Sequence, residues 1–250
     1  MDRKTKKIRA DLLLIKQFPE KTLDEAKKNI LAGLVRSSED NVIKNSSELV
    51  SSDTSLTIDE NHQYVSRGAL KLNGALDKYL PDLTGKIAAD IGSSTGGFTD
   101  LMLQYGASKV YAIDVGYGQL HYKLRQDKRV ISMERFNARE MTETSLPEKV
   151  DVVTMDLSFI SVLKVLKGVN TVLKENGWAF ILVKPQFEAE RHEVERGGVV
   201  RDPQIREKYI MKVKDFAEHE LFWTELDTIP SPILGPKGNQ EFILVCKKND

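Results

Sequence analysis

The stretch that decides the fold is Ala89-Asp90-Ile91-Gly92-Ser93-Ser94-Thr95-Gly96-Gly97-Phe98, where a short apolar run passes into a glycine-rich turn and then into an apolar helix. Glycines at such a junction let the backbone approach a ligand closely and leave helix N-terminal amides available as donors. The spacing is Gly-x-x-x-Gly-Gly, which differs from the Gly-x-Gly-x-x-Gly of dinucleotide-binding proteins. The alternative interpretation is that these glycines only turn the chain.

Apolar runs alternate with helical patterns on both sides of this turn. Strands are predicted at residues 87–91, 110–115, 130–133, 152–157 and 179–183, and helices at 66–79, 99–105, 162–173 and 203–221. Residues 226–229 and 241–245 flank a loop rich in proline and glycine, which predicts a C-terminal hairpin. The alternation predicts an α/β domain built on a doubly wound, mostly parallel seven-stranded sheet that ends in this antiparallel hairpin.

Composition narrows the class of protein. The 250 residues are 40% apolar and 30% charged, with 37 Lys and Arg against 37 Asp and Glu. This balance is typical of a soluble globular chain, and the length fits one large domain or an ordinary domain with a small one. No apolar run is long enough to span a bilayer and no apolar targeting segment follows the basic start, so we expect a cytoplasmic protein. The single cysteine, Cys246, excludes an internal disulfide framework and a cysteine-based zinc site.

The first 60 residues have a pattern of their own. Residues 1–30 hold nine Lys or Arg against five Asp or Glu, whereas residues 31–60 hold two against six. A short helix is predicted near Leu12 to Ile15 and a second from Thr22 to Leu31, with Thr22 and Glu25 spaced as a capping box. Short β-prone pieces follow. We therefore expect a small α+β domain at 1–60, a linker at 61–65 and the larger domain at 66–250.

Two acidic residues flank the glycine turn. Asp90 precedes the first glycine, and Asp114 ends the next predicted strand, where its carboxylate suits the two hydroxyls of a ribose. Together with the turn they resemble the S-adenosylmethionine site of Rossmann-like methyltransferases. The cofactor contacts that the resemblance implies come from Asp90, Gly92, Ser94, Gly96, Gly97, Phe98 and Asp114, with Asn137 on the adenine side.

Four charged residues occupy positions where a doubly wound fold places its chemistry. Asp156 and Lys184 close two apolar strands, Glu241 opens the last strand, and Lys71 lies on the polar face of the helix predicted before the first strand. Charged residues at the ends of apolar strands are costly to bury unless they are paired, which favours a functional role. The alternative is a structural ion-pair cluster that holds the strand ends together.

Longer strings make the resemblance specific. The four charged residues resemble the Lys-Asp-Lys-Glu arrangement of FtsJ-like ribose 2'-O-methyltransferases. Tyr-Val-Ser-Arg-Gly at 64–68, Asp-Val-Gly-Tyr-Gly-Gln-Leu at 114–120, Lys-Pro-Gln-Phe-Glu at 184–188 and Gly-Pro-Lys-Gly-Asn-Gln-Glu at 235–241 resemble the TlyA family, also called haemolysin A. The resemblance implies 2'-O-methylation of cytidines in ribosomal RNA with S-adenosylmethionine and no metal, and therefore ribosomal RNA or ribosomal subunits as partners.

The chemistry of that reaction suits these residue types. A ribose hydroxyl is a poor nucleophile until it loses its proton, so the protein must supply a base, alignment and charge stabilisation. Lys184 is the candidate base, or at least the group that stabilises the forming alkoxide. Asp156 and Glu241 are expected to orient it, and Lys71 is expected to add a positive field that favours its neutral form.

The basic start of the chain is a candidate RNA contact, because phosphate contacts dominate affinity for nucleic acids. The candidate contacts are Arg3, Lys4, Lys6, Lys7, Arg9, Lys27, Lys28 and Arg67. Charge alone favours a solvated surface. The pattern Arg-Ala-Asp-Leu-Leu-Leu at 9–14 with residues 26–35, however, resembles the S-four-type (alpha-L) RNA-binding module. The sequence departs from that module after Val35, where Arg-Ser-Ser-Glu-Asp replaces the usual Asn-Gly turn.

Three other functions are weighed against an RNA methyltransferase. A membrane-active haemolysin needs a spanning or amphipathic segment, and the sequence offers neither. A non-catalytic RNA-binding protein would not need the four charged residues, and a small-molecule methyltransferase would not need the N-terminal module. Residues 188–200 are charged and end in a double glycine, so they form either a lid over the RNA or a plain surface loop.

Overall fold

The computed structural model describes residues 6–38, 41–43, 45–59 and 63–250. The chain divides into two compact units, residues 1–68 and 69–250, and each is described by itself. Among the described residues, no helix is both long and apolar enough to cross a membrane. The same part of the chain contains no group of three or more His, Cys, Asp or Glu side chains arranged to hold a metal ion.

The first unit packs two helices against two small antiparallel pairs of strands. Its elements are β1 (Lys7–Arg9), α1 (Ala10–Gln17), α2 (Leu23–Leu31), β2 (Val35–Ser37), β3 (Leu49–Ser51) and β4 (Leu56–Ile58), with β1 paired to β3 and β2 to β4. The predicted capping box is confirmed, because Thr22 and Glu25 each accept a hydrogen bond from the other's backbone amide. Ala10, Leu13, Leu14, Ala26 and Ile30 form the centre of the core.

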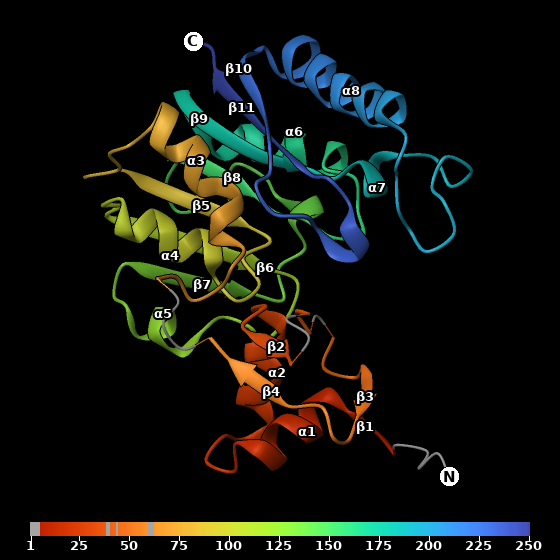
Figure 1. The fold of residues 1–250 in the computed structure, drawn as a ribbon. Coiled ribbons are helices and arrows are strands. Elements are labelled where there is room, and N and C mark those ends of the chain that lie inside the picture. The colour runs from red at the N-terminus through yellow and green to blue at the C-terminus, as the bar shows by residue number, and fades with distance from the viewer. Residues whose placement is uncertain (1–5, 39–40, 44, 60–62) are drawn as a thin grey trace. The chain divides into compact units, whose positions relative to one another are not determined.

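The second unit carries the predicted seven-stranded sheet (Figure 1). Its elements in chain order are α3 (Ala69–Tyr79), β5 (Ile87–Ile91), α4 (Gly97–Gln104), β6 (Lys109–Asp114), α5 (Tyr122–Gln126), β7 (Val130–Glu134), η1 (Ala138–Glu140), β8 (Val150–Met155), α6 (Leu163–Val172), β9 (Leu173–Val183), α7 (Pro185–Glu188), α8 (Pro203–Leu221), β10 (Trp223–Pro230), η2 (Pro236–Gly238) and β11 (Phe242–Lys248). The strand order is β10-β11-β9-β8-β5-β6-β7. Strands β5 to β9 are parallel, and β11 runs antiparallel to both β9 and β10, so the predicted sheet and hairpin are confirmed.

Alternation along the strands assigns each face of the sheet its helices. Ala89, Ile91, Val153 and Met155 share a core with apolar residues of α6 and α8. The intervening residues point to the opposite face, where Asp90 meets Thr99 of α4. Figure 1 shows α3 and α4 together on that face. Both faces are covered, which is why these strands are apolar almost throughout.

Several boundaries differ from the prediction. Helix α3 begins at Ala69 rather than Ser66, and β9 begins at Leu173, six residues before the predicted start at Ala179. Strand β10 begins at Trp223 rather than Leu226. The early part of β9 is mostly polar, so it lacks the apolar pattern by which a strand is predicted from sequence. Its pairing with β8 is also irregular, with a register shift between Val150 and Val152.

The strand order indicates that a ligand site should lie at the carboxyl ends of the central strands. Strands β6 and β7 follow β5 on one side of it, and the chain then returns to place β8 on the other side of β5. The switch point of the sheet therefore lies between the neighbouring strands β5 and β8. Ligands of doubly wound proteins bind beyond the carboxyl ends of the strands at such a point. The glycine turn follows β5, and Asp156 follows β8, so both lie at these carboxyl ends.

Candidate functional site

The glycine turn connects β5 to α4 and is curled tightly. Gly92, Ser94 and Gly96 all have positive φ, of 85°, 47° and 95°, which is common for glycine and costly for serine. A Cβ at Gly92 would collide with the backbone oxygen of Asp156, whose amide in turn donates to Ile91 at 3.0 Å. The turn and the end of β8 are therefore in direct backbone contact, and glycine is required there by close approach as well as by φ.

Asp90 is turned into the protein beneath the glycine turn. It is 1% exposed, and its carboxylate accepts hydrogen bonds from the amide and hydroxyl of Thr99 and from the hydroxyl of Thr154. Burial raises the pKa of Asp90 to about 7, although the threonine hydrogen bonds oppose this rise. In this arrangement the carboxylate ties the first turn of α4 to β8, and its predicted contact with a cofactor stays a prediction.

Asp114 lies at the carboxyl end of β6 and faces the glycine turn. One carboxylate oxygen accepts the amide of Ser94 at 2.8 Å, and the other accepts the amide of Gly116 at 2.7 Å. Each oxygen has a second lone pair that can still accept from a ligand hydroxyl. Asp114 therefore links the glycine turn to the loop that follows β6.

The other predicted cofactor residues are distributed around these loops. Gly97 and Phe98 are buried in the first turn of α4. Asn137 follows β7 and caps the short helix η1, where its side chain accepts the amide of Arg139 at 3.2 Å and donates to Glu140 at 3.1 Å. The Asp114 carboxylate at the end of β6 can still accept from ligand hydroxyls, which fits a ribose, whereas the amides of Gly92, Ser93, Ser94 and Gly96 already donate within the protein.

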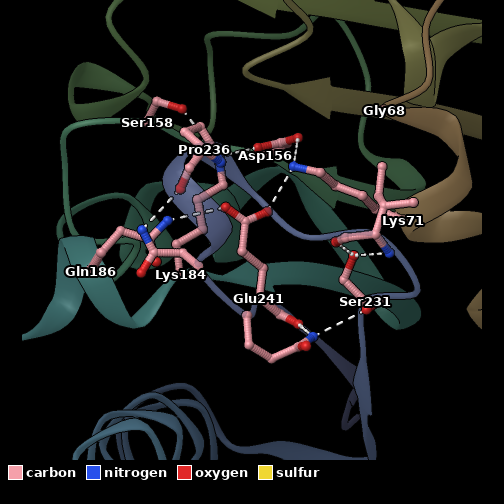
Figure 2. A network of polar contacts seen from close by, with 12 residues as sticks. Gly68, Lys71, Asp156, Ser158, Lys184, Gln186, Ser231, Pro236 and Glu241 are labelled. Atoms are coloured by element: carbon pink, nitrogen blue, oxygen red, sulfur yellow. Dashed lines mark hydrogen bonds and ion pairs between the residues drawn. The ribbon is translucent and has the colours of Figure 1, made fainter. Parts of the chain in front are cut away.

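The structure brings the four charged side chains together at the ends of β8, β9 and β11 (Figure 2). Lys184 Nζ lies 2.5 Å from Asp156 Oδ1, and Lys71 Nζ lies 3.6 Å from Asp156 Oδ2 and 2.7 Å from Glu241 Oε2. The order is therefore Lys184, Asp156, Lys71, Glu241, with positive and negative charges alternating. The side chain of Glu241 is fully buried and that of Lys184 is 6% exposed.

Ion pairing offsets the cost of burial for Lys71 and Asp156. Burial lowers the pKa of Lys71, but the carboxylates of Asp156 and Glu241 outweigh it and the net pKa is raised. Burial likewise raises the pKa of Asp156, but Lys184 and Lys71 outweigh it and the net pKa is lowered. Removal of Lys71 or of Asp156 therefore takes away a charge that compensates a buried partner.

The geometry corrects one expected contact. Glu241 was expected to orient Lys184, but its two oxygens accept from Lys71 and from the side-chain amide of Gln186 at 3.1 Å. Asp156 is the carboxylate that contacts Lys184, and Ser158 is a second partner at 3.1 Å. A Cβ at Gly235 would collide with the Glu241 carboxylate, so a glycine at this position makes room for it.

Residues that the sequence analysis did not select also surround Lys184. The ring of Phe187 lies 5.8 Å from Lys184 Nζ and 5.3 Å from the ring of Phe159, which is 91% exposed. Glu188 is buried and accepts from the hydroxyl of Ser161 and the amide of Val162, and so anchors the loop that carries Phe159. Phe187 and Glu188 lie in the string after Lys184, but no local pattern marks Phe159.

Residues 188–200, which the sequence predicts to be either a lid or a plain surface loop, are hydrogen-bonded to the hairpin loop. Asn239 is 3% exposed, and its side chain donates to the Gly198 carbonyl at 2.9 Å and accepts from the Val200 amide at 3.0 Å. The Glu190 amide donates to the Tyr209 hydroxyl of α8 at 2.9 Å. This segment is thus held at both ends in the described state.

The predicted RNA contacts of the first unit are mostly exposed. Lys6, Lys7 and Lys27 are exposed, whereas Arg9 pairs with Asp11 at 2.6 Å and Lys28 pairs with Asp24 at 2.8 Å. Arg67 is half-buried, and its backbone amide donates to the Ala32 carbonyl. Arg3 and Lys4 lie outside the described residues.

Comparison with known proteins identifies the family. The model of the FtsJ-like methyltransferase family matches residues 64–248. The chain is 41% identical over 241 residues to the 16S/23S rRNA (cytidine-2'-O)-methyltransferase TlyA of Mycobacterium tuberculosis, covering 96% of this chain and 89% of that protein. It is 40% identical over 219 residues to hemolysin A of Brachyspira hyodysenteriae, covering 86% and 89%. A solved structure of a hemolysin-named protein from Streptococcus thermophilus matches with a TM-score of 0.76 and 40% identity, covering 98% of this chain and 89% of that one. This chain belongs to the FtsJ-like methyltransferase family, among relatives that carry the names TlyA and hemolysin A.

Proposed function

We propose that this protein is an S-adenosylmethionine-dependent methyltransferase that modifies the 2'-hydroxyl of cytidine riboses in ribosomal RNA. The observation that carries the proposal is the buried alternation of Lys184, Asp156, Lys71 and Glu241 at the switch point of the sheet, beside the glycine turn. The relative from M. tuberculosis bears the name of an rRNA (cytidine-2'-O)-methyltransferase. The family membership and the charge cluster therefore both support methylation of a ribose 2'-hydroxyl.

In the proposed reaction Lys184 Nζ takes the proton of the attacking 2'-hydroxyl. S-adenosylmethionine, bound beside the glycine turn and Asp114, would supply a methyl group on its sulfonium sulfur. As the 2'-oxygen bonds to that methyl carbon, the carbon–sulfur bond would break and the neutral thioether S-adenosylhomocysteine would leave. Lys184 must be neutral to accept a proton, and Lys71 shares the Asp156 carboxylate with it, which weakens the hold of that carboxylate on the Lys184 ammonium.

Two further parts of the chain support an RNA substrate. Phe159 presents an almost fully exposed ring against Phe187, the residue whose ring faces Lys184, and aromatic side chains are common platforms on which unpaired bases stack. The N-terminal module, residues 1–60 with a linker at 61–65, offers the exposed lysines at positions 6, 7 and 27 to phosphates. A small-molecule methyltransferase would need neither feature.

The test is methyl transfer by the purified protein. Ribosomal RNA and ribosomal subunits are incubated with radiolabelled S-adenosylmethionine, and 2'-O-methylated nucleotides are mapped by mass spectrometry of nuclease fragments. We expect label on cytidine riboses with the wild type and none with Lys184→Ala. Label on bases alone, or no label on any ribosomal RNA, would overturn the proposal.

A further inference from the structure

Gln186 contacts the charge cluster but has no part in the reaction proposed above. It lies in α7, two residues after Lys184, and its Nε2 donates to Glu241 Oε1 at 3.1 Å. Lys71 Nζ donates to the other oxygen of the same carboxylate at 2.7 Å. Glu241 is thus held at both oxygens by donors from two different helices, one charged and one neutral (Figure 2).

The orientation of the Gln186 amide is fixed by its partner. The reversed amide would place Oε1 against a carboxylate oxygen, so only the orientation with Nε2 toward Glu241 is favourable. This orientation leaves Oε1 buried without a hydrogen-bond partner, the only such side-chain nitrogen or oxygen within the residues that the structure describes. A buried acceptor without a donor is destabilising, and an apolar side chain of similar shape would avoid that cost.

We propose that Gln186 is a positioning residue that holds Glu241 in place for Lys71 and thereby maintains the order of charges up to Lys184. The inference rests on the proposed function, because the cluster is assumed to act on the RNA hydroxyl. Without the amide, Glu241 is free to turn away from Lys71, which then binds Asp156 more strongly and draws that carboxylate away from Lys184.

Gln186→Leu is the first test, since leucine has a similar size but neither the donor nor the unpartnered oxygen. Single-turnover methyl transfer at saturating S-adenosylmethionine and RNA is expected to fall about 10- to 100-fold, as for a small misplacement in an active site. The urea midpoint of unfolding is expected to stay the same or rise. A glutamine with only a structural role would lower the midpoint and leave the rate of the folded enzyme unchanged, and a near-normal rate overturns the inference.

Gln186→Glu provides a pH-dependent test in an isosteric side chain. A second carboxylate beside Glu241 favours uptake of one shared proton, and the protonated form carries an O–H donor in place of the amide. The rate of this variant relative to the wild type is expected to recover as the pH is lowered. Gln204→Glu, on the exposed first turn of α8, adds the same charge elsewhere in the unit and should keep the wild-type pH profile. Overlap of the Gln186→Glu and wild-type profiles would contradict the positioning role.

A measurement without substrates separates this inference from the proposed function. The Lys71 ammonium is largely buried in ion pairs, so its ¹⁵N–H signal, assigned by its loss in Lys71→Arg, should be protected from exchange with water. In Gln186→Leu we expect that exchange to accelerate. If the wild type methylates no ribosomal RNA but exchange is faster in Gln186→Leu than in the wild type, only the proposed function is overturned. Unchanged exchange in Gln186→Leu overturns only the positioning role.

Discussion

Asp90→Asn is expected to change the pH dependence of stability in a direction that can be worked out from the structure. The carboxylate is 1% exposed and accepts hydrogen bonds from Thr99 and Thr154, and it forms no ion pair within the part of the chain that the structure describes. Asparagine has the same shape. Its Oδ1 can accept from Thr99, and its amide can donate to the Thr154 hydroxyl, so the substitution removes the titration and keeps the contacts.

The magnitude follows from the raised pKa of Asp90. The ordinary value is 3.8 and burial raises it to about 7 in the folded protein. A carboxyl with a raised pKa contributes stability at low pH that is lost as the pH rises through the folded value. The full loss is about 4 kcal/mol, of which about 2.5 kcal/mol falls between pH 5 and pH 8. We therefore compare the free energy of unfolding of Asp90→Asn with that of the wild type at each pH. The difference, variant minus wild type, should be about 2.5 kcal/mol larger at pH 8 than at pH 5.

Urea unfolding followed by tryptophan fluorescence measures this difference. The only two tryptophans, Trp178 and Trp223, both lie in the unit Ala69–Asp250, so the signal reports the unit that contains Asp90. Asp215→Asn, at an exposed position on α8, serves as the matched control and should show no pH-dependent gain. A difference between Asp90→Asn and the wild type that is the same at pH 5 and pH 8 would refute the reasoning.

Four other outcomes are expected. Lys184→Arg should retain binding of S-adenosylmethionine and RNA but lose about 100- to 10,000-fold in single-turnover methyl transfer, because guanidinium cannot accept a proton; near-normal turnover would make Lys184 an electrostatic group only. Asp114→Ala should weaken S-adenosylmethionine binding in calorimetry without unfolding the domain, and equal affinities would remove Asp114 from the site. Gly235→Ala should displace the buried glutamate and reduce methyl transfer, whereas the control Gly74→Ala, whose added Cβ meets nothing within 4 Å, should be neutral or slightly stabilising; equal effects would contradict the close-approach argument. Lys27→Glu should weaken RNA binding and flatten its salt dependence, and an unchanged salt slope would show that this lysine does not meet phosphate.

The sheet was predictable because its central strands are mostly apolar. Residues 87–91 and 152–157 are short, mostly apolar runs, each with an aspartate as its last residue but one, and the burial of the strands on both faces explains their apolar character. By contrast, β1 is only three residues long and is stabilised by pairing with β3 far along the chain, so no local periodicity predicts it. At Val42 the pairing is limited to an isolated antiparallel bridge with Arg36.

The candidate site was predictable in its members but not in its contacts. Lys184 and Asp156 stand out because charged residues end apolar strands. Which carboxylate meets which lysine depends on the twist and register of three strands, and so the pairing of Glu241 with Lys71 could not be read from spacing. Gln186 was missed for a related reason, since an uncharged polar residue carries no signal until its buried partner is known.

The place of β11 in the sheet determines when, during synthesis of the chain, the charge cluster can be completed. Strand β10 is synthesised before β11, yet among the described strands it pairs with β11 alone, and β11 lies between β10 and β9. Lys71 and Glu241 are 170 residues apart, and Glu241 directly precedes that final strand. A nascent chain halted before β11 would carry the glycine turn and Lys184 but no completed charge cluster. Premature release or stalling late in translation should therefore yield a chain in which Lys71 lacks its Glu241 partner.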